Sequence, residues 1–307
     1  MIVTITGANG FARKQELSKL VASFVQSHGD MAVERFDGEE TPAERLRESV
    51  ESLPFLSARK LVVLREPGKQ KAFVENITDI LAAAAETTDL IIVESKLDKR
   101  SAYYKTLHKQ TNFLEFGELD SAGLARWAAE YVTDHKGTLS MADARLLIDR
   151  IGPNQQLLQS ELDKLLSFNS KITRQTIEAL VEPTPQSTVF ELLDAAFSGN
   201  AKRTLQLYKE QRAMKVEALA IVAMLVWQLH IVTVVKAAGN RSADDIGRLS
   251  KLSPFVVRKS QHIARKLSGG QIKTLVAGLL ALDIRLKTTG VDADEALQYF
   301  LLQTAKI

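Results

Sequence analysis

The residues best suited to chemistry follow the first apolar run of the chain, residues 2–6. A phosphate-binding loop here would read Gly, four residues, Gly, Lys and then Ser or Thr, because its N–H groups hold phosphate and the hydroxyl holds magnesium. Counted from Gly7, the last three places hold an alanine, Arg13 and Lys14, so the lysine is displaced by one position and no hydroxyl is present. Gly7, Gly10, Arg13 and Lys14 therefore predict the remnant of a nucleotide-binding loop without its catalytic groups.

Other groups that nucleotide hydrolysis or metal binding requires are also missing. A hydrolase carries an acidic pair after the strand predicted here for residues 61–64, where the pair holds magnesium and polarises water. This chain has Arg65 at that place, followed by Glu66, which we interpret as a solvated loop residue. The 5 histidines share no ligand spacing and cysteine is absent, so we expect no metal, no cofactor and no catalytic residue.

Residues 267–271 match the signature loop of ABC transporter ATPases, which offers backbone N–H groups and a serine to a γ-phosphate. No true P-loop precedes the segment, and Asp283 is followed by isoleucine instead of the glutamate that such an enzyme carries. We therefore interpret residues 267–271 as a glycine-rich turn that ends one helix and caps the next.

A short connector ahead of residues 61–64 is unusually apolar, since it contains Leu53, Phe55 and Leu56 around a proline. Loops normally stay polar because they run over the protein surface. These side chains either fold back into the core of their own domain or fill the pocket of a partner. Burying one Phe and one Leu is worth about 1.5–3 kcal/mol for each residue, which is enough to decide a protein–protein contact.

Two stretches concentrate positive charge. Residues 241–273 hold eight Lys or Arg against two Asp, and the candidate nucleic-acid contacts there are Arg258, Lys259, Arg265 and Lys266. A second cluster follows residues 90–93 and consists of Lys96, Lys99, Arg100, Lys105 and Lys109. Both stretches read either as solvated helix faces or as contacts to a phosphate backbone.

The first third of the chain alternates between short β-branched runs and helical segments, which predicts a parallel sheet with helices on both faces. The predicted strands are residues 2–6, 32–36, 61–64, 90–93 and 113–116. The runs at 61–64 and 90–93 are apolar throughout, as in strands that are covered on both faces. Thr41, with Pro42 and Glu44 behind it, predicts a capped helix start, and residues 120–136 predict a further helix.

After about residue 138 the strand pattern ends and the chain reads as helices. Three are predicted at 141–151, 156–168 and 173–181, and a capping box of Thr188 and Glu191 predicts another that ends at Gly199. The remaining helices are separated near residues 239–240, 253–254, 268–270 and 290. We expect three domains: an α/β domain over 1–138, a small helical domain over 139–200 and a larger all-α domain over 201–307.

The length and composition of the chain agree with a multidomain protein, because 307 residues, of which 45% are hydrophobic, can build two or three cores. A net charge of +3 does not require a nucleic-acid partner, and the lack of cysteine fits a reducing cytoplasm. We see no signal peptide at the N-terminus. Residues 218–235 are apolar enough to suggest either the buried central helix of a bundle or a membrane helix, and we favour the buried helix.

An ordered set of segments resembles the delta-subunit family of the bacterial DNA polymerase III clamp loader over essentially the whole chain. The matching segments are residues 53–64, 91–100, 161–165 and 189–194, with Asp283 and Lys287 near the end. The resemblance implies an AAA+-like domain, a helical lid and a C-terminal helical collar that joins a ring of subunits as a hetero-oligomer. Members do not hydrolyse ATP, which agrees with the incomplete P-loop, and residues 152–155 lack the arginine that AAA+ loaders place in the lid.

The resemblance also implies partners and a binding site. Phe55 and Leu56, flanked by Leu53, would insert into the sliding clamp (the beta subunit) and open its ring during DNA replication. Glu51 stands where some members carry glutamine. The other partners would be the ATPase and delta-prime-type subunits, bound through the collar, and primed DNA. We expect no membrane partner and a cytoplasmic, nucleoid-associated location in a bacterium.

Two alternatives remain at this level. One is an active AAA+ NTPase with a divergent P-loop, and the other is a nucleic-acid-binding module that works through the basic helices. In the clamp-loader hypothesis the chain has no ATPase activity of its own, although its holoenzyme is classed with the DNA-directed DNA polymerases.

Overall fold

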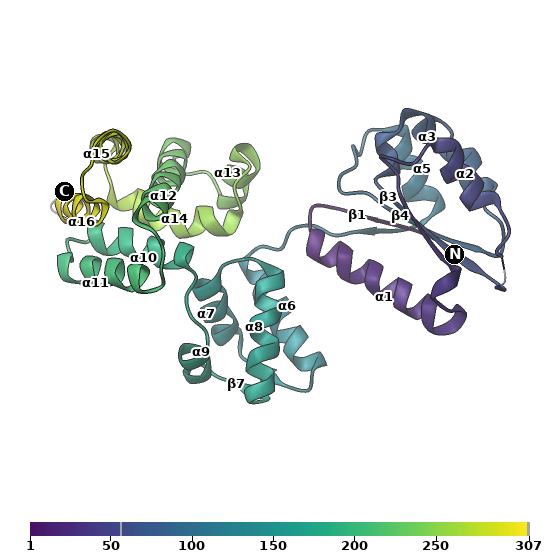
Figure 1. Cartoon of the computed structure of the whole chain (residues 1–307), viewed down its shortest axis with the longest axis horizontal. Coiled ribbons are helices and arrows are strands. Elements are labelled where there is room, and N and C mark those ends of the chain that lie inside the picture. Colours follow the sequence, from purple (N-terminus) through teal and green to yellow (C-terminus); the bar gives the residue numbers. More distant parts are fainter. Residues whose placement is uncertain (56, 306–307) are drawn as a thin grey trace. The chain divides into compact units, whose positions relative to one another are not determined.

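Five parallel strands form one sheet within residues 1–119, in the order β2-β3-β4-β1-β5 (Figure 1). The strands are β1 (Ile2–Thr6), β2 (Val33–Asp37), β3 (Lys60–Arg65), β4 (Thr88–Val93) and β5 (Asn112–Glu115). The five predicted strands are therefore confirmed to within two residues. In β3 and β4 the residues Leu61–Leu64 and Leu90–Ile92 are at most 1% exposed, as expected of strands with both faces covered.

The computed structural model describes residues 1–55 and 57–305, without the side chains of Gln186 and Ser187. The chain divides into two compact units, residues 1–119 and 120–307.

Helices cover both faces of the sheet. Those of the first unit are α1 (Gly10–His28), α2 (Ala43–Glu51), α3 (Lys71–Glu75), α4 (Ile77–Ala82) and α5 (Ala102–Gln110), with short 3₁₀ turns η1 (Asp30–Ala32) and η2 (Pro67–Lys69). Leu17 and Phe24 of α1 pack on one face of the sheet, while the other helices of the first unit pack on the opposite face (Figure 1). The predicted α/β architecture, a parallel sheet with helices on both faces, is confirmed.

The predicted cap of α2 is wrong. The helix begins at Ala43 with Pro42 at the N-cap position and no side-chain cap. The backbone N–H of Thr41 donates to the carbonyl of Asp37, so Thr41 belongs to the turn after β2.

The second unit begins earlier than the predicted boundary at residue 138. Its first helices are α6 (Ser121–Asp134), α7 (Met141–Ile151), α8 (Gln155–Phe168), α9 (Arg174–Leu180) and α10 (Pro185–Phe197). Leu124, Ala128 and Val132 of α6 belong to the same apolar cluster as Leu147 of α7 and Leu162 of α8. Packing on these neighbours places α6 in the second unit, so the first unit ends at residue 119.

Two local features of this region differ from the sequence expectation. Thr138–Leu139 (β6) and Lys171–Ile172 (β7) form a small parallel sheet where no strand was predicted. The Thr188–Glu191 capping box is also wrong, because α10 already begins at Pro185, a residue favoured in the first turn of a helix. The hydroxyl of Thr188 instead donates to the carbonyl of Thr184, the residue before the helix.

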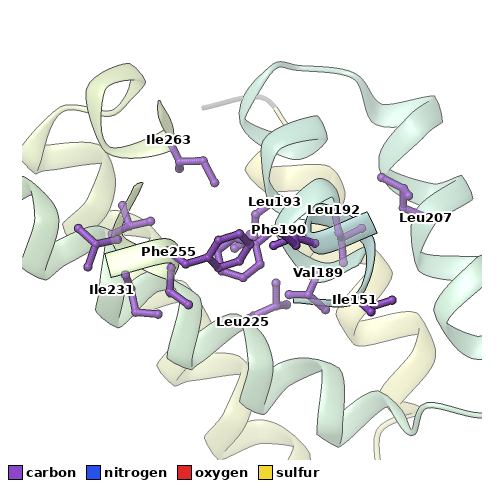
Figure 2. Packing of buried hydrophobic residues seen from close by; sticks show 14 of the residues in the cluster. Ile151, Val189, Phe190, Leu192, Leu193, Leu207, Leu225, Ile231, Phe255 and Ile263 are labelled. Atoms are coloured by element: carbon purple, nitrogen blue, oxygen red, sulfur yellow. The ribbon is translucent and has the colours of Figure 1, made fainter. Parts of the chain in front are cut away.

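Up to residue 305, where the described residues end, six further helices follow: α11 (Ala201–Ala213), α12 (Ala218–Ala238), α13 (Ala243–Ser250), α14 (Pro254–Lys266), α15 (Gly269–Thr288) and α16 (Ala293–Thr304). Helix α12 lies at the centre, where it packs against α10 and α13–α16 (Figure 1). Figure 2 shows Phe190 of α10 meeting Leu225 of α12 and Phe255 of α14 in the apolar core. By length and hydropathy α12 could cross a membrane, yet half of its most apolar window is buried in this bundle, as in a core helix.

The predicted division of this unit at residue 200 stays a prediction. One apolar cluster runs from Leu124 to Leu301, and α10 packs on both α7 and α11.

Candidate functional site

The apolar connector between α2 and β3 begins where α2 stops at Glu51. A residue before proline is disfavoured in the α region, so Leu53 ahead of Pro54 opposes continuation of the helix. The last turn closes with the N–H of Ser52 donating to the carbonyl of Glu48 at 2.9 Å. We call the residues from Ser52 to Arg59 the tip segment.

Polar contacts tie both ends of the tip segment to the sheet. Lys60, whose side chain is 3% exposed, donates through Nζ to Oγ of Ser52 at 2.7 Å. Arg59 donates to both carboxylate oxygens of Asp89, at 2.7 and 3.3 Å, and the amino group of Met1 binds the same carboxylate. Burial alone would raise the pKa of Asp89, but these hydrogen bonds outweigh it and hold that pKa below its ordinary value.

Between these anchors the apolar side chains face solvent. Leu53 is 75% exposed and Phe55 is 87% exposed. Folding back into the core of the domain is therefore excluded for these two residues, while Leu56 lies outside the described residues. Adjacent exposed apolar groups on a connector with anchored ends have the form of a docking element.

An acidic depression of about 520 Å³ lies beside the tip segment. It is lined by Glu34, Phe36, Arg45, Glu48, Ser49, Glu51 and Ser52. Glu51, the residue that replaces glutamine in the resemblance, forms an ion pair with Arg47 at 2.5 Å. Glu34 is also paired, with Lys60 at 3.6 Å, so Glu48 is the one lining carboxylate without an ion pair among the described residues, and it is the group that a basic side chain of a partner would meet.

The remnant loop after β1 is held together by its own hydrogen bonds. Gly7 has φ +114°, and a Cβ there would lie 2.2 Å from the carbonyl oxygen of Phe116, so only glycine fits. The N–H of Asn9 donates to that carbonyl at 3.0 Å, and the side chain of Asn9 accepts from the N–H of Ala12 at 3.0 Å. N–H groups that would face a phosphate in a working P-loop are thus engaged within the chain.

Arg13 and Lys14 lie at the start of α1 with different surroundings. Arg13 reaches back toward Gly10, where an added Cβ would be 3.7 Å from its Nη2, and its Nε is buried. Lys14 is exposed. The structure therefore brings Gly7, Gly10, Arg13 and Lys14 together at the end of β1.

The acidic residues at the ends of β3 and β4 serve as cross-links. Glu66 lies in the partly exposed loop after β3, as predicted, at φ +54°, and it accepts from the N–H and Oγ of Ser95 at 2.8 and 3.1 Å. Glu94 accepts from the N–H of Gly68 at 2.7 Å and from the hydroxyl of Tyr103 at 2.9 Å. Burial raises the pKa of Glu94 to about 7 although both hydrogen bonds act to lower it.

Sequence reasoning missed Glu94, although an ionisable residue directly after an apolar strand run was a usable signal. No group of three or more His, Asp or Glu side chains placed to hold a metal ion occurs in the part of the chain that the structure describes.

Three of the four candidate nucleic-acid contacts are engaged within the second unit. Arg258 pairs with Asp244 at 2.9 Å, and Lys266 pairs with Asp194 at 2.9 Å. Lys259 lies 5.0 Å from the ring centroid of Phe190, and burial lowers its pKa. Arg265 forms no ion pair among the described residues.

Two loops singled out in the sequence are helix junctions. Ser268 and Gln271 form a capping box at the start of α15, which confirms residues 267–271 as a turn between helices. Gly152, with φ +89°, ends α7, and Asn154 caps α8.

Comparisons with known proteins find similarity to the same family in both units of the chain. The model of the DNA polymerase III delta subunit family matches residues 4–117, and the model of the C-terminal domain of that subunit matches residues 186–304. The chain is 23% identical over 322 residues to the DNA polymerase III subunit delta of Bacillus subtilis, covering 99% of this chain and 93% of that protein. The structure of the Bacillus subtilis DNA clamp loader delta protein is similar, with a TM-score of 0.82, 22% identity, and coverage of 100% of this chain and 95% of that chain.

We expect Glu94→Gln to change how stability depends on pH. The pKa of Glu94 is raised from 4.5 to about 7, so the folded chain binds more protons than the unfolded chain between these pH values. The free energy of unfolding of the wild type therefore falls as the pH rises through this window, by up to about 3 kcal/mol from this group. An amide does not titrate, so the variant lacks this decrease.

Urea denaturation followed by far-ultraviolet circular dichroism, from pH 5 to pH 8, measures the effect. The exposed Glu86→Gln serves as the matched control and is expected to follow the wild-type profile. Parallel profiles for Glu94→Gln and the wild type would contradict the assignment.

Proposed function

The chain belongs to the DNA polymerase III delta subunit family, and from this premise we propose that it binds the sliding clamp through Leu53, Phe55 and Leu56 and favours the open form of the ring. The observation that carries the proposal is the exposure of Leu53 and Phe55 on a connector anchored at both ends. The chain acts here as a clamp-loader subunit that supplies binding energy rather than catalysis.

The anchors matter because ordering a loop on binding costs free energy. Arg59 and Lys60 hold the ends of the tip segment before the partner arrives, so less conformational freedom is lost in the complex. Burying the Phe and the Leu contributes about 1.5–3 kcal/mol each. This energy opens a clamp only to the extent that the open form offers a better pocket than the closed one.

The acidic depression beside the tip segment supplies the polar part of the proposed recognition. Glu51, which stands in place of glutamine, is paired with Arg47, so Glu48 is the lining carboxylate that would attract a basic group on the clamp.

The collar helices carry the proposed contact with the other clamp-loader subunits. Val276, Leu280 and Ile284 of α15 are 44%, 58% and 52% exposed and recur every four residues on one helix face. Leu219 and Val226 of α12 are also exposed, which explains why only half of this apolar helix is buried in the isolated chain. We expect the assembly to be cytoplasmic and nucleoid-associated.

Replacing the apolar tip is the direct test of clamp binding. We expect Phe55→Ala/Leu56→Ala to weaken clamp binding by about 3 kcal/mol, more than 100-fold in Kd, if both side chains are buried in the complex. Surface plasmon resonance on immobilised clamp measures the change. Phe168→Ala removes an equally large exposed ring from the second unit and should bind as the wild type does. Equal binding by the folded tip variant would remove the proposed site.

Titration with ATP and magnesium separates this function from that of an active NTPase. We expect no saturable binding and no phosphate release from the wild type, because loop N–H groups are already engaged and the P-loop hydroxyl is missing. Turnover that is lost in Lys14→Ala would favour the NTPase instead.

Placing charge on α15 tests the collar contact. We expect Leu280→Asp/Ile284→Asp to lower the fraction of chain that co-elutes with the partner clamp-loader subunits at least about tenfold, because an unpaired buried carboxylate is costly. Thr274→Asp, on another face of α15, is the matched control. Both variants should keep wild-type clamp binding, and normal co-elution of the double variant would place the contact elsewhere.

A further inference from the structure

A pocket of about 450 Å³ in the second unit gathers positive charge between α12 and α14. It is lined by Val235, Lys236, Gly239, Asn240, Arg241, Gln261, Ala264 and Arg265. The lining thus offers three cations and two amide side chains and contains no carboxylate. We call it the basic pocket.

The cations of the basic pocket differ from their neighbours in the same basic stretch. Arg248 pairs with Asp245 at 2.8 Å, and Arg258 and Lys266 are also paired with carboxylates. Within residues 1–55 and 57–305, neither Arg241 nor Arg265 forms an ion pair. Two exposed guanidinium groups therefore line one pocket without a counter-charge from the described part of the chain, and such an arrangement attracts an anion.

The fold preforms the basic pocket. Gly239, at φ +65°, ends α12 and turns the chain toward Arg241. Gln261 and Arg265 are four residues apart on α14 and so lie on the same face of this helix. Lys236 donates through Nζ to the carbonyl of Ala264 at 3.0 Å, which joins α12 to α14 across the pocket.

This set of donors matches a phosphate group. Guanidinium groups bind phosphate oxygens in a bidentate manner, and Asn and Gln side chains commonly donate to phosphate and sugar. We propose that the basic pocket binds phosphate groups of the backbone of single-stranded DNA. The choice of DNA over free phosphate rests on the proposed function in replication.

The binding surface is thus not the one that the basic sequence stretch suggested. Arg265 is shared with that prediction and Lys236 and Arg241 are added. Arg258, Lys259 and Lys266 are left out, because each has a partner within the chain.

Fluorescence anisotropy of a labelled oligodeoxythymidylate with the full chain tests the proposal. We expect Arg241→Gln/Arg265→Gln to weaken binding about tenfold at low salt and to make the slope of log K against log salt shallower by about 1.4, since each contact to single-stranded DNA contributes about 0.7. Lys202→Gln/Lys273→Gln is the matched control. It removes two exposed lysines that have no ion pair in the described part of the chain, and it should bind as the wild type does.

Equal losses in both double variants, or no loss in the pocket variant, would overturn the proposal. Competition with inorganic phosphate separates the two sources of the anion. Saturable binding of inorganic phosphate that is lost in the pocket variant, together with oligonucleotide binding that the pocket variant leaves unchanged, would overturn the choice of DNA and assign the pocket to free phosphate. Clamp binding by the pocket variant should stay at the wild-type level, so failure here is distinct from failure of the proposed clamp site.

Discussion

The pairing of Arg59 with Asp89, joined by the contact of Lys60 with Ser52, is the constraint on which the proposed function depends. Exposed apolar side chains gain nothing for an isolated chain, and a loose connector would collapse onto the nearest apolar surface. Two charge-assisted anchors at the start of β3 and β4 hold the tip segment on the sheet and leave Phe55 in solvent. The sheet can serve as the anchor because its central strands are buried on both faces.

The two edges of this sheet have different chemistry. The tip segment lies at the edge where β3 begins, and the remnant nucleotide loop lies at the opposite edge, where the parallel strands end. At that second edge, Asn9, Glu66 and Glu94 all bond to the chain itself, so groups that would face phosphate and magnesium in a hydrolase cross-link neighbouring strands and loops. These hydrogen bonds hold together the edge where the strands end. The same sheet supports the tip segment at the edge where β3 begins.

In the helical unit, the partners of each basic side chain, rather than the number of basic residues, decide which positive charges are available to a ligand. Most basic side chains along α14 have carboxylate or aromatic partners that hold neighbouring helices together, as Lys266 does with Asp194. Only where partners are lacking, as at Arg241 and Arg265, does positive charge remain available to a ligand. Exposed apolar residues on α12 and α15 likewise lack partners within the described part of the chain, and these are the surfaces through which we propose contact with the other clamp-loader subunits.

The sequence alone was enough to predict the five strands β1–β5, helix α7 to the residue, and the incomplete loop at Gly7, because runs of buried apolar residues, helix periodicity and glycine positions are local signals. It also carried the family resemblance. What only the tertiary structure decided depends on contacts between distant residues. Packing of α6 on α7 and α8 moved the unit boundary, the engagement of Glu94 by Gly68 and Tyr103 was invisible in the pattern, and the exposure of Phe55 was left open. Composition counts charges, but only the fold places each cation beside a carboxylate or leaves it without one.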